Sequence, residues 1–408
     1  MVRAFGRIGL LSFGGPAAQI AVMQDELVDR RAWLDRETFL RGLGFCTLLP
    51  GPEAMQLSTF AGWRLAGWRG GLAAGLLFVL PGAVVMATLA TLYLAYGRLP
   101  LVEAAFLGVK AATLAIVAGA LWTLRRKALD GGFATGLAVA SFLALFLVGV
   151  PFWAVVGAAL LIGAFRGGPM PGHVPAPVPA GGVATLRVVA TWLAVWWAPL
   201  LVVMAAAPGT PAAQAATFFS WLATVSFGGA YAVLAALAQV AVEDFGWLTP
   251  EQMLDGLGLA ETTPGPLILV TLFTAILGGA QGGWGMAAST GAVCLWATFA
   301  PCFLWIFAGA PHLMRLTADP RLAGALRAVT AAVVGVVANL AIWFAIHLLF
   351  LRVPPRPGWG PPVPDWSSID VTAAGLCLFA LVWHLGLRRG LGETLALAAA
   401  AGLALALV

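Results

Sequence analysis

The sequence predicts an all-α polytopic membrane protein made of two inverted repeats with broken or re-entrant helices. The first observation is composition: 61% of the 408 residues are hydrophobic and 10% are charged, whereas soluble domains carry about 25% charged residues. The second is a series of long apolar segments separated by short polar gaps. The third is an internal repeat in which glycine and proline breaks recur inside apolar segments.

The apolar segments and two Pro/Gly-rich stretches define the expected organisation. We expect helices at about 4–24, 38–62, 71–96, 104–124, 132–149, 151–166, 187–206, 214–241, 252–279, 284–310, 323–351, 371–386 and 391–408. Proline and glycine make 167–186 an extended linker, and 352–370 is a second polar loop. The predicted domains are an N-terminal transporter repeat at 1–166, this linker, and a C-terminal transporter repeat at 187–408.

The repeat is visible as short motifs at one constant offset. Ser12-Phe13-Gly14-Gly15 recurs as Ser226-Phe227-Gly228-Gly229, and Pro50-Gly51-Pro52 recurs as Pro264-Gly265-Pro266. A weaker match continues beyond these motifs, so the repeated core covers about 4–124 and 214–343. Broken helices at corresponding positions of two halves are a sequence indicator of a transporter substrate site.

The distribution of Lys and Arg favours re-entrant segments. If every apolar segment spans, the arginine-rich loop at 30–41 lies on the side that is poor in basic residues. If the four broken segments are re-entrant, most Lys and Arg fall on one side, as the positive-inside rule requires. In both cases an odd number of crossings separates the copies, which are then inverted. If 132–166 formed one helix instead of two, the number of crossings between the copies would be even and the copies would not be inverted.

Other function classes find little support. The basic residues cluster in short loops, which is typical of membrane topology and not of nucleic-acid binding. The four cysteines lie singly in apolar segments and the four histidines are scattered, so no cofactor or metal is expected. Without GxSxG or HExxH motifs an integral-membrane enzyme is disfavoured, and without a Walker A motif transport must use an ion gradient or a partner.

The breaks themselves are the candidate site. Pro16, Pro52 and Pro266 are each expected to start a half-helix, which leaves the N–H groups of the next residues free to bind an anion. The alternative is that these glycines and prolines are kinks and close-packing points, which are common in membrane helices. The candidate substrate-binding residues are Ser12, Gly14, Gly15, Pro50, Gly51, Pro52, Ser226, Gly228, Gly229, Thr262, Thr263, Pro264, Gly265 and Pro266.

Three charged residues are candidates for ion coupling. Lys110 is a basic residue well inside an apolar segment, where ionisable groups are functional by default. It could instead pair with Glu103 or reach the membrane interface. Glu53 stands at a helix N-terminus, where it either complements the helix dipole or must be protonated, or paired with Lys110 or Arg64, when an anion binds.

The motifs as a whole resemble one family. SFGGPAAQIAVMQDELVDRRAWL (from Ser12), LLPGPEAMQLSTFAGWRLAGWRGG and FVLPG, with SFGGAYAVLAALAQVAVEDFGWL and AETTPGPL in the second half, resemble the long-chain, two-domain form of the chromate ion transporter family. The resemblance implies a chromate exporter of the bacterial inner membrane that confers chromate resistance, with sulfate as a competing anion. Leu272 stands where the family usually shows Gln.

Oxyanion transport gives the candidate residues a physical role. A dianion in a low-dielectric cavity needs several donors in place of its water. Backbone N–H groups and the hydroxyls of Ser12, Ser226, Thr262 and Thr263 can supply them, and Gln19, Gln24 and Gln56 can add amides. For Thr262 and Thr263, capping of the helix after Pro264-Gly265-Pro266 is an equal alternative.

The leading hypothesis is a multi-pass secondary transporter that exports chromate by alternating access of two inverted halves. The alternative is a carrier or channel for sulfate or another oxyanion, for which chromate is incidental. The expected partners are chromate, sulfate as an analogue, and membrane lipid, with no nucleic acid. The small-residue faces Gly71-Gly75 and Ala111-Ala115-Gly119 pack either within one chain or in a homodimer.

Overall fold

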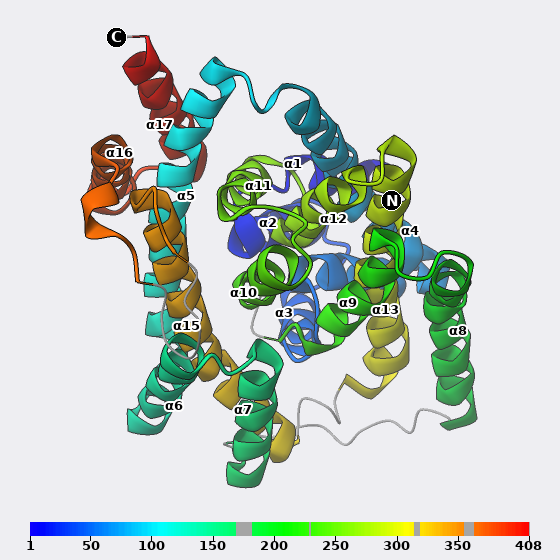
Figure 1. Cartoon of the computed structure of the whole chain (residues 1–408). Coiled ribbons are helices and arrows are strands. Elements are labelled where there is room, and N and C mark those ends of the chain that lie inside the picture. The colour runs from blue at the N-terminus through cyan, green and yellow to red at the C-terminus, as the bar shows by residue number, and fades with distance from the viewer. Residues whose placement is uncertain (169–181, 228–229, 314–318, 355–362, 408) are drawn as a thin grey trace. The chain divides into compact units, whose positions relative to one another are not determined.

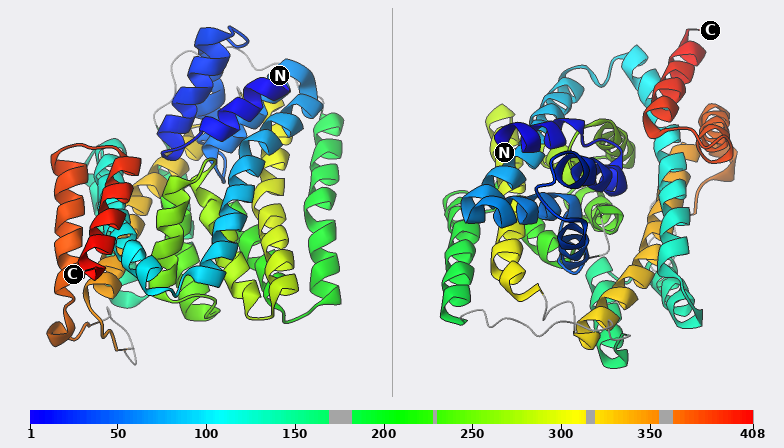
Figure 2. Two further views of the ribbon diagram at one scale, coloured as in Figure 1. Left: turned by 90° about the horizontal axis from the view of Figure 1, so that it is seen from above. Right: turned by 180° about the vertical axis from the view of Figure 1, so that it is seen from behind.

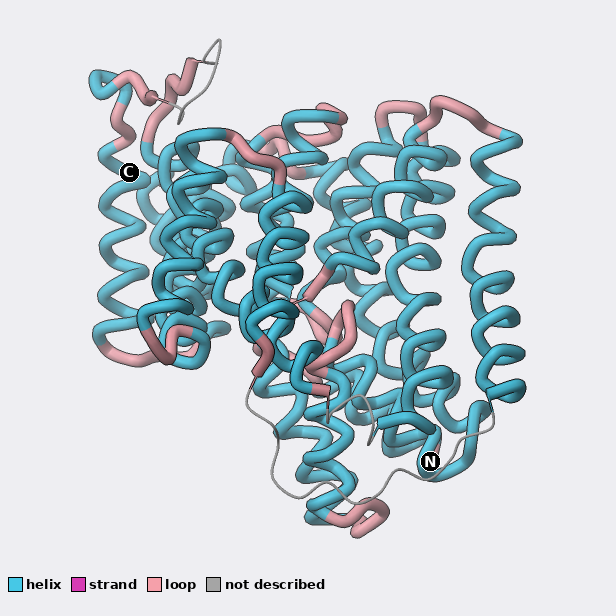
Figure 3. Tube along the Cα trace, turned by 90° about the horizontal axis from the view of Figure 1, so that it is seen from below, coloured by secondary structure: helices cyan, strands magenta, loops and turns pink. Residues whose placement is uncertain are grey.

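The chain is helical throughout the part that the structure describes. The computed structural model describes residues 1–168, 182–227, 230–313, 319–354 and 363–407. Within these ranges the one strand-like feature is an isolated bridge between Phe350 and Ile369. Figure 3 shows this helical content, with loops at helix ends and at breaks between helices. The prediction of an all-α protein is confirmed.

The helices follow the predicted apolar segments closely, including the breaks inside them (Figure 1). The elements are α1 (Val2–Leu11), α2 (Gly15–Gln24), η1 (Asp25–Arg30), α3 (Arg36–Cys46), α4 (Glu53–Tyr96), α5 (Pro100–Ala128), α6 (Gly132–Leu143), η2 (Ala144–Val148), α7 (Phe152–Arg166), α8 (Gly182–Ala206), α9 (Pro211–Val225), α10 (Ala230–Ala238), η3 (Gln239–Asp244), α11 (Pro250–Thr262), η4 (Leu267–Leu269), α12 (Val270–Ala280), α13 (Trp284–Gly309), η5 (Ala310–His312), α15 (Pro320–Leu349), η6 (Trp366–Ser368), α16 (Val371–Leu381), η7 (Val382–Gly386) and α17 (Leu391–Ala406).

Within the described residues, five helices are long and apolar enough to cross a membrane. They are Glu53–Tyr96, Pro100–Ala128, Val183–Ala206, Trp284–His312 and Pro320–Leu349. The first of them is two helices merged across a kink at Ala66 and Gly67, where Gly67 has a φ of 62°. These spans confirm a polytopic membrane protein.

Two helices that flank the predicted breaks are short. α1 has 10 residues and α3 has 11, so each is only about 15–17 Å long, about half the thickness of a bilayer core, whereas α2 continues directly into η1. Segments of this length fit the re-entrant prediction. The inverted orientation of the repeats stays a prediction.

The region 132–166 is two helices and not one. α6 continues into η2 and stops at Gly149, which adopts the left-handed conformation with a φ of 71°, and Pro151 precedes α7. Proline cannot continue a helix because it lacks an N–H donor, and glycine adopts a positive φ without a steric penalty. Residues 132–166 therefore do not form the single helix that would make the number of crossings between the copies even.

Residues pack into two compact units, and each unit combines segments from both halves of the sequence. The first comprises Met1–Thr88, Ile162–Val233 and Thr263–Leu326, and the second comprises Leu89–Leu161, Leu234–Thr262 and Arg327–Val408. The predicted repeat boundaries describe the sequence and stay a prediction. The predicted linker 167–186 lies mostly outside the described residues, and α8 already begins at Gly182.

In the first unit α13 is the central helix. It packs against α8, α9 and α12, and α8 runs alongside it in Figure 2. α4 also approaches α13 through its small-residue face: a Cβ on Gly71 would lie 2.6 Å from the ring of Phe307, and one on Gly75 would lie 2.7 Å from Phe303. The face at Gly71-Gly75 therefore packs within one chain.

In the second unit the central helix is α5. α17 lies along it, as Figures 1 and 2 show, and a Cβ on Gly108 would overlap the carbonyl of Ala398. Ala112 and Ala115 are fully buried against Leu395 and Ala398. Small residues let the two backbones approach closely, which strengthens van der Waals packing where no water drives association. This face of α5 also packs within one chain.

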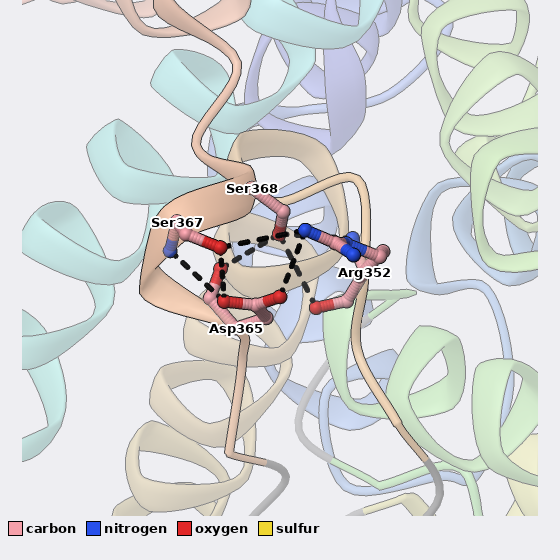
Figure 4. A network of polar contacts seen from close by, with 4 residues as sticks. All are labelled: Arg352, Asp365, Ser367 and Ser368. Atoms are coloured by element: carbon pink, nitrogen blue, oxygen red, sulfur yellow. Dashed lines mark hydrogen bonds and ion pairs between the residues drawn. The ribbon is translucent and has the colours of Figure 1, made fainter.

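The second predicted loop is closed by a polar network (Figure 4). Asp365 accepts hydrogen bonds from the hydroxyl and the backbone N–H of Ser367 at 2.6 and 3.0 Å, and Arg352 Nη2 lies 3.0 Å from its other oxygen. The hydrogen bonds from Ser367, together with Arg352, lower the pKa of Asp365 below its usual value. The network ties Arg352, which follows α15, to residues 365–368, which precede α16.

Candidate functional site: the crossed helix breaks

The breaks of the two repeats are joined by a reciprocal pair of hydrogen bonds in the first unit. The N–H of Gly51 donates to the carbonyl of Ser226 at 3.1 Å, and the N–H of Gly265 donates to the carbonyl of Ser12 at 2.8 Å. Ser226 is the repeat counterpart of Ser12, and Gly265 is the counterpart of Gly51. Each Pro-Gly-Pro break is therefore tied to the Ser-Phe-Gly-Gly break of the other copy.

The backbone conformations of the two copies also correspond. Ser12 has φ −81° and ψ 71°, and Ser226 has φ −79° and ψ 58°. Gly51 and Gly265 have φ of 116° and 90°, a region that side-chain-bearing residues rarely adopt. The motif glycines are thus required by the backbone itself. Gly14 and Gly15 also have a φ of 81°. The predicted site residues Gly228 and Gly229 lie outside the described residues.

Two buried glutamines of the first copy complete the cluster. Gln19 Nε2 donates to the carbonyl of Gly265 at 2.7 Å, and Gln56 Nε2 donates to the carbonyl of Pro50 at 2.6 Å. Gln56 is fully buried, and its Oε1 has no hydrogen-bond partner within the described residues. The repeat counterparts are Val233 and Val270, so the two copies share a backbone but differ in side-chain polarity.

The half-helix starts occur where the prolines predict them. Pro16 lies in the first turn of α2, Pro52 directly precedes α4, and Pro266 is the N-cap of η4. The first N–H groups of a helix have no acceptor within it, so each start offers donors to another group. Accessibility differs between them: Ala17 is exposed, whereas Ile268 is 2% exposed.

The hydroxyl groups are used differently from the prediction. Ser12 Oγ donates to the carbonyl of Ile8 at 2.6 Å, Ser226 Oγ to that of Ala223 at 3.3 Å, and Thr262 Oγ1 to that of Leu259 at 2.8 Å. Each of these hydroxyls donates its proton to a carbonyl of its own helix, because the carbonyls at a helix end have no backbone donor. They are not free to donate to an anion in this conformation.

The alternative for the two threonines, helix capping, is wrong. Thr262 is the last residue of α11, and the helix after the break begins behind Pro266. Thr263 is 3% exposed and lies before Pro264, outside that helix start. Pro264 itself packs tightly: a Cβ on Gly82 of α4 would overlap its carbonyl. The break is fixed by packing on α4 and not by a side-chain cap.

The three charged candidates differ in burial and in the unit to which they belong. Glu53 opens α4 and is half-buried, while Arg64 is exposed eleven residues later. Helical rise places their backbones about 16 Å apart, so a direct ion pair between them does not form. Lys110 belongs to the second unit, where its Nζ lies 3.7 Å from Asp255 Oδ1. The ion pair of Lys110 is with Asp255, and not with Glu103 as the alternative supposed.

Sequence reasoning missed Asp255 and its neighbour Tyr93. The hydroxyl of Tyr93 donates to Asp255 Oδ2 at 2.7 Å, and Asp255 is 4% exposed. The signal was available: Asp255 is an acid inside the predicted apolar segment 252–279, and such residues are functional by default. The partners could not be named because they lie on α4, α5 and α11, far apart in the sequence.

The chain is similar to known transport proteins over most of its length. A family model described as Chromate transporter matches residues 1–164 and 213–406. A chromate transport protein of Pseudomonas aeruginosa is 33% identical over 83% of this chain and 79% of its own. A probable chromate transport protein of Synechococcus elongatus is 29% identical over 84% and 83%, and a chromate transport protein of Cupriavidus metallidurans 28% identical over 85% and 82%.

The resemblance seen in the motifs is confirmed by these matches, which cover both copies of the repeat. No solved structure matches the chain. Together with the five candidate spans, the family match shows a multi-pass membrane transporter and not an enzyme. This protein belongs to the chromate transporter family.

Proposed function

We propose that this protein is a secondary transporter that exports chromate across the bacterial inner membrane. The observation that carries the proposal is the reciprocal hydrogen bonding of the four breaks, in a chain whose relatives are named chromate transport proteins. Paired broken helices are where transporters of many folds bind substrate. The Gly and Pro residues of both copies and the amide of Gln56 form the binding region.

The chemistry of the cluster suits a tetrahedral dianion. A dianion that leaves water needs several hydrogen-bond donors, and helix N-termini supply them together with a favourable dipole. The donors here are neutral, so they hold the anion without the deep electrostatic trap that an arginine cluster would make. Neutral donors distinguish anions by size and shape more than by charge. Sulfate should therefore compete with chromate.

The crossed bonds also suggest how access alternates. Each bond joins a break of one copy to a break of the other, so movement of one copy against the other must change both bonds together. With two inverted copies, breaking one arrangement and forming its mirror would expose the breaks first to one side and then to the other. Glu53, half-buried at the start of α4, would then sense the charge of the bound anion.

Chromate uptake into everted membrane vesicles tests this function. Vesicles containing the full chain should accumulate chromate, sulfate should inhibit uptake, and a protonophore should abolish it; vesicles without the protein are the control. Uptake that saturates and depends on a counter-ion supports a carrier. Robust sulfate flux without chromate flux would overturn chromate as the substrate and favour the alternative, a carrier or channel for sulfate or another oxyanion.

A further inference from the structure

The second unit contains a polar cavity that the proposed anion site does not use. Its volume is about 590 Å³. It lies beside Gly97 and Arg98, in the loop that joins α4 to α5, and beside Thr249, just before α11. The ionisable residues that line it are Tyr93, Arg98, Glu103, Lys110, Glu251 and Asp255.

The cavity leads from exposed charges to a buried ion pair. Arg98, Glu103 and Glu251 are exposed, whereas the side chains of Lys110 and Asp255 are 15% and 6% exposed. The exposed members lie close to the beginning of α5 or of α11, so the polar mouth is at the helix ends. A polar cavity of this size holds water. Water in it would connect the surface with the carboxylate of Asp255.

The buried pair is poorly satisfied as an ion pair. Lys110 Nζ and Asp255 Oδ1 are 3.7 Å apart, which is beyond hydrogen-bonding distance. Oδ2 accepts the hydroxyl of Tyr93, but Oδ1 has no hydrogen-bond partner within the described residues. A buried pair offsets its desolvation only with close geometry and full hydrogen bonding. Stability alone does not explain these charges, and buried charges inside membrane proteins usually serve ion or proton movement.

The surrounding packing holds this geometry rigidly. A Cβ on Gly258, three residues after Asp255, would overlap Val109 of α5 and lie 2.9 Å from the hydroxyl of Thr113. α11 therefore lies directly on α5 at the level of the pair. Tyr93 packs edge-on against Phe106, with ring centroids 5.3 Å apart. This packing places Asp255 of α11 beside Lys110 of α5.

The net charge of the side chains that line the cavity indicates which kind of ion it can bind. Three carboxylates and two cationic side chains line the cavity, which leaves one excess negative charge when all are ionised. Such a lining repels a divalent anion, so this is not a second chromate site. It favours a cation, and Asp255, the buried carboxylate of the three, with one oxygen that accepts no hydrogen bond among the described residues, binds a proton more readily than it surrounds a metal ion. No metal-binding group of three His, Cys, Asp or Glu residues occurs among the described residues.

We propose that Asp255 is the proton-binding residue that couples transport to the proton gradient. A proton from cavity water binds Asp255 Oδ1, forming an O–H bond and neutralising the carboxylate. Lys110 then loses its counter-ion and the lining becomes neutral overall. Asp255 lies seven residues, about two helical turns, before the end of α11, which leads directly into Pro264-Gly265-Pro266. The assignment of this proton to anion export rests on the proposed function.

Infrared difference spectroscopy of the purified full-length protein tests the proton site without any transport. Titration with acid should produce the C=O band of a buried protonated carboxyl. The band should be missing in Asp255→Asn, shifted in Asp255→Glu and present in Glu251→Gln. Glu251→Gln is a matched control because it removes a carboxylate from the same helix and cavity at an exposed position. An unchanged band in Asp255→Asn would overturn the proposal.

Proteoliposomes then test coupling. We expect the pH-gradient stimulation of chromate flux to fall at least about tenfold in Asp255→Asn, while exchange without a gradient persists. Asp255→Glu should restore part of the stimulation, and replacement of sodium by choline should change nothing. Full stimulation in Asp255→Asn, or stimulation that requires sodium, would contradict a proton on Asp255. If wild-type protein moved no chromate, the proposed function would fail, whereas the infrared result would still decide the proton site.

Discussion

The crossed breaks of the first unit and the ion-pair cavity of the second contain different kinds of polar group. The breaks offer neutral backbone groups, held in place by glycine conformations and by two reciprocal hydrogen bonds. The cavity offers ionised side chains around one unpartnered carboxylate oxygen. Neutral donors hold a multiply charged anion less tightly than cationic side chains would, whereas a proton needs a titrating group. In our proposals the breaks bind the anion and the cavity couples its transport to protons.

The largest effect is expected when one member of the buried pair is removed. Lys110→Met leaves Asp255 buried without its counter-ion, which should destabilise the protein by about 3–5 kcal/mol. The double change Lys110→Met with Asp255→Asn should recover most of this loss, because no unpaired charge remains. Thermal unfolding in detergent measures both, and Glu103→Gln is the control at an exposed position of the same cavity. Equal stability of Lys110→Met and wild type would contradict a buried, interacting pair.

The glycines of the crossed breaks should come next. Gly51→Ala and Gly265→Ala both force a Cβ into a positive-φ conformation, at a cost of about 1–3 kcal/mol each. The new Cβ of Gly51→Ala would also lie 2.9 Å from Gln56 Nε2, and that of Gly265→Ala 3.2 Å from Leu269. Similar losses of stability and of chromate flux in both variants would support equivalent roles for the two copies.

Gly44→Ala provides the matched control for these changes. Gly44 is inside α3, and a Cβ there would meet nothing within 4 Å, so this variant should be neutral or slightly more stable. If Gly51→Ala were impaired and Gly265→Ala were not, the two breaks would differ in function despite their common backbone.

The buried glutamines of the first copy, which have valine counterparts in the second, test whether the two copies differ in function. Gln56→Ala removes the hydrogen bond to Pro50 and a buried amide at the first break, and should lower chromate flux about tenfold, the equivalent of ~1.4 kcal/mol. Gln24→Ala changes a residue of the same type that the sequence also offered as a donor, but Gln24 lies at the end of α2 opposite the break, so this variant should leave flux close to wild type. Initial rates in proteoliposomes give the comparison. Normal flux in Gln56→Ala would remove side-chain amides from the binding region.

The smallest effect is expected far from both regions, at the loop of Figure 4. Because hydrogen bonds from Ser367 lower the pKa of Asp365 in the folded protein, its contribution is present above the pKa of the unfolded chain. That contribution is lost as pH falls through the lowered pKa. The protection of the amides at 363–370 against hydrogen exchange, relative to their intrinsic rates at the same pH, should therefore fall at acidic pH and in Asp365→Asn, with transport unchanged. A transport defect in this variant would give the loop an unforeseen role.

Local residue chemistry allowed much of the architecture to be predicted. Pro16, Pro52 and Pro266 mark helix starts because proline lacks an N–H donor and has a fixed φ, and these properties act within a few residues. Gly51 and Gly265, which the repeat aligns, both adopt a positive φ, since identical local sequences have the same steric limits. Membrane class and family followed from composition and from the motifs.

Only the tertiary structure decided which groups meet. In the tertiary structure each break is hydrogen-bonded to a break of the opposite copy. The hydroxyls of Ser12, Ser226 and Thr262 donate to carbonyls of their own helices. Lys110 lies beside Asp255. These outcomes depend on how α5 and α11 approach at Gly258 and how α4 lies against Pro264, which involve residues far apart in the chain. Backbone conformation is set by neighbours in sequence, whereas the partner of a buried charge is set by packing in three dimensions.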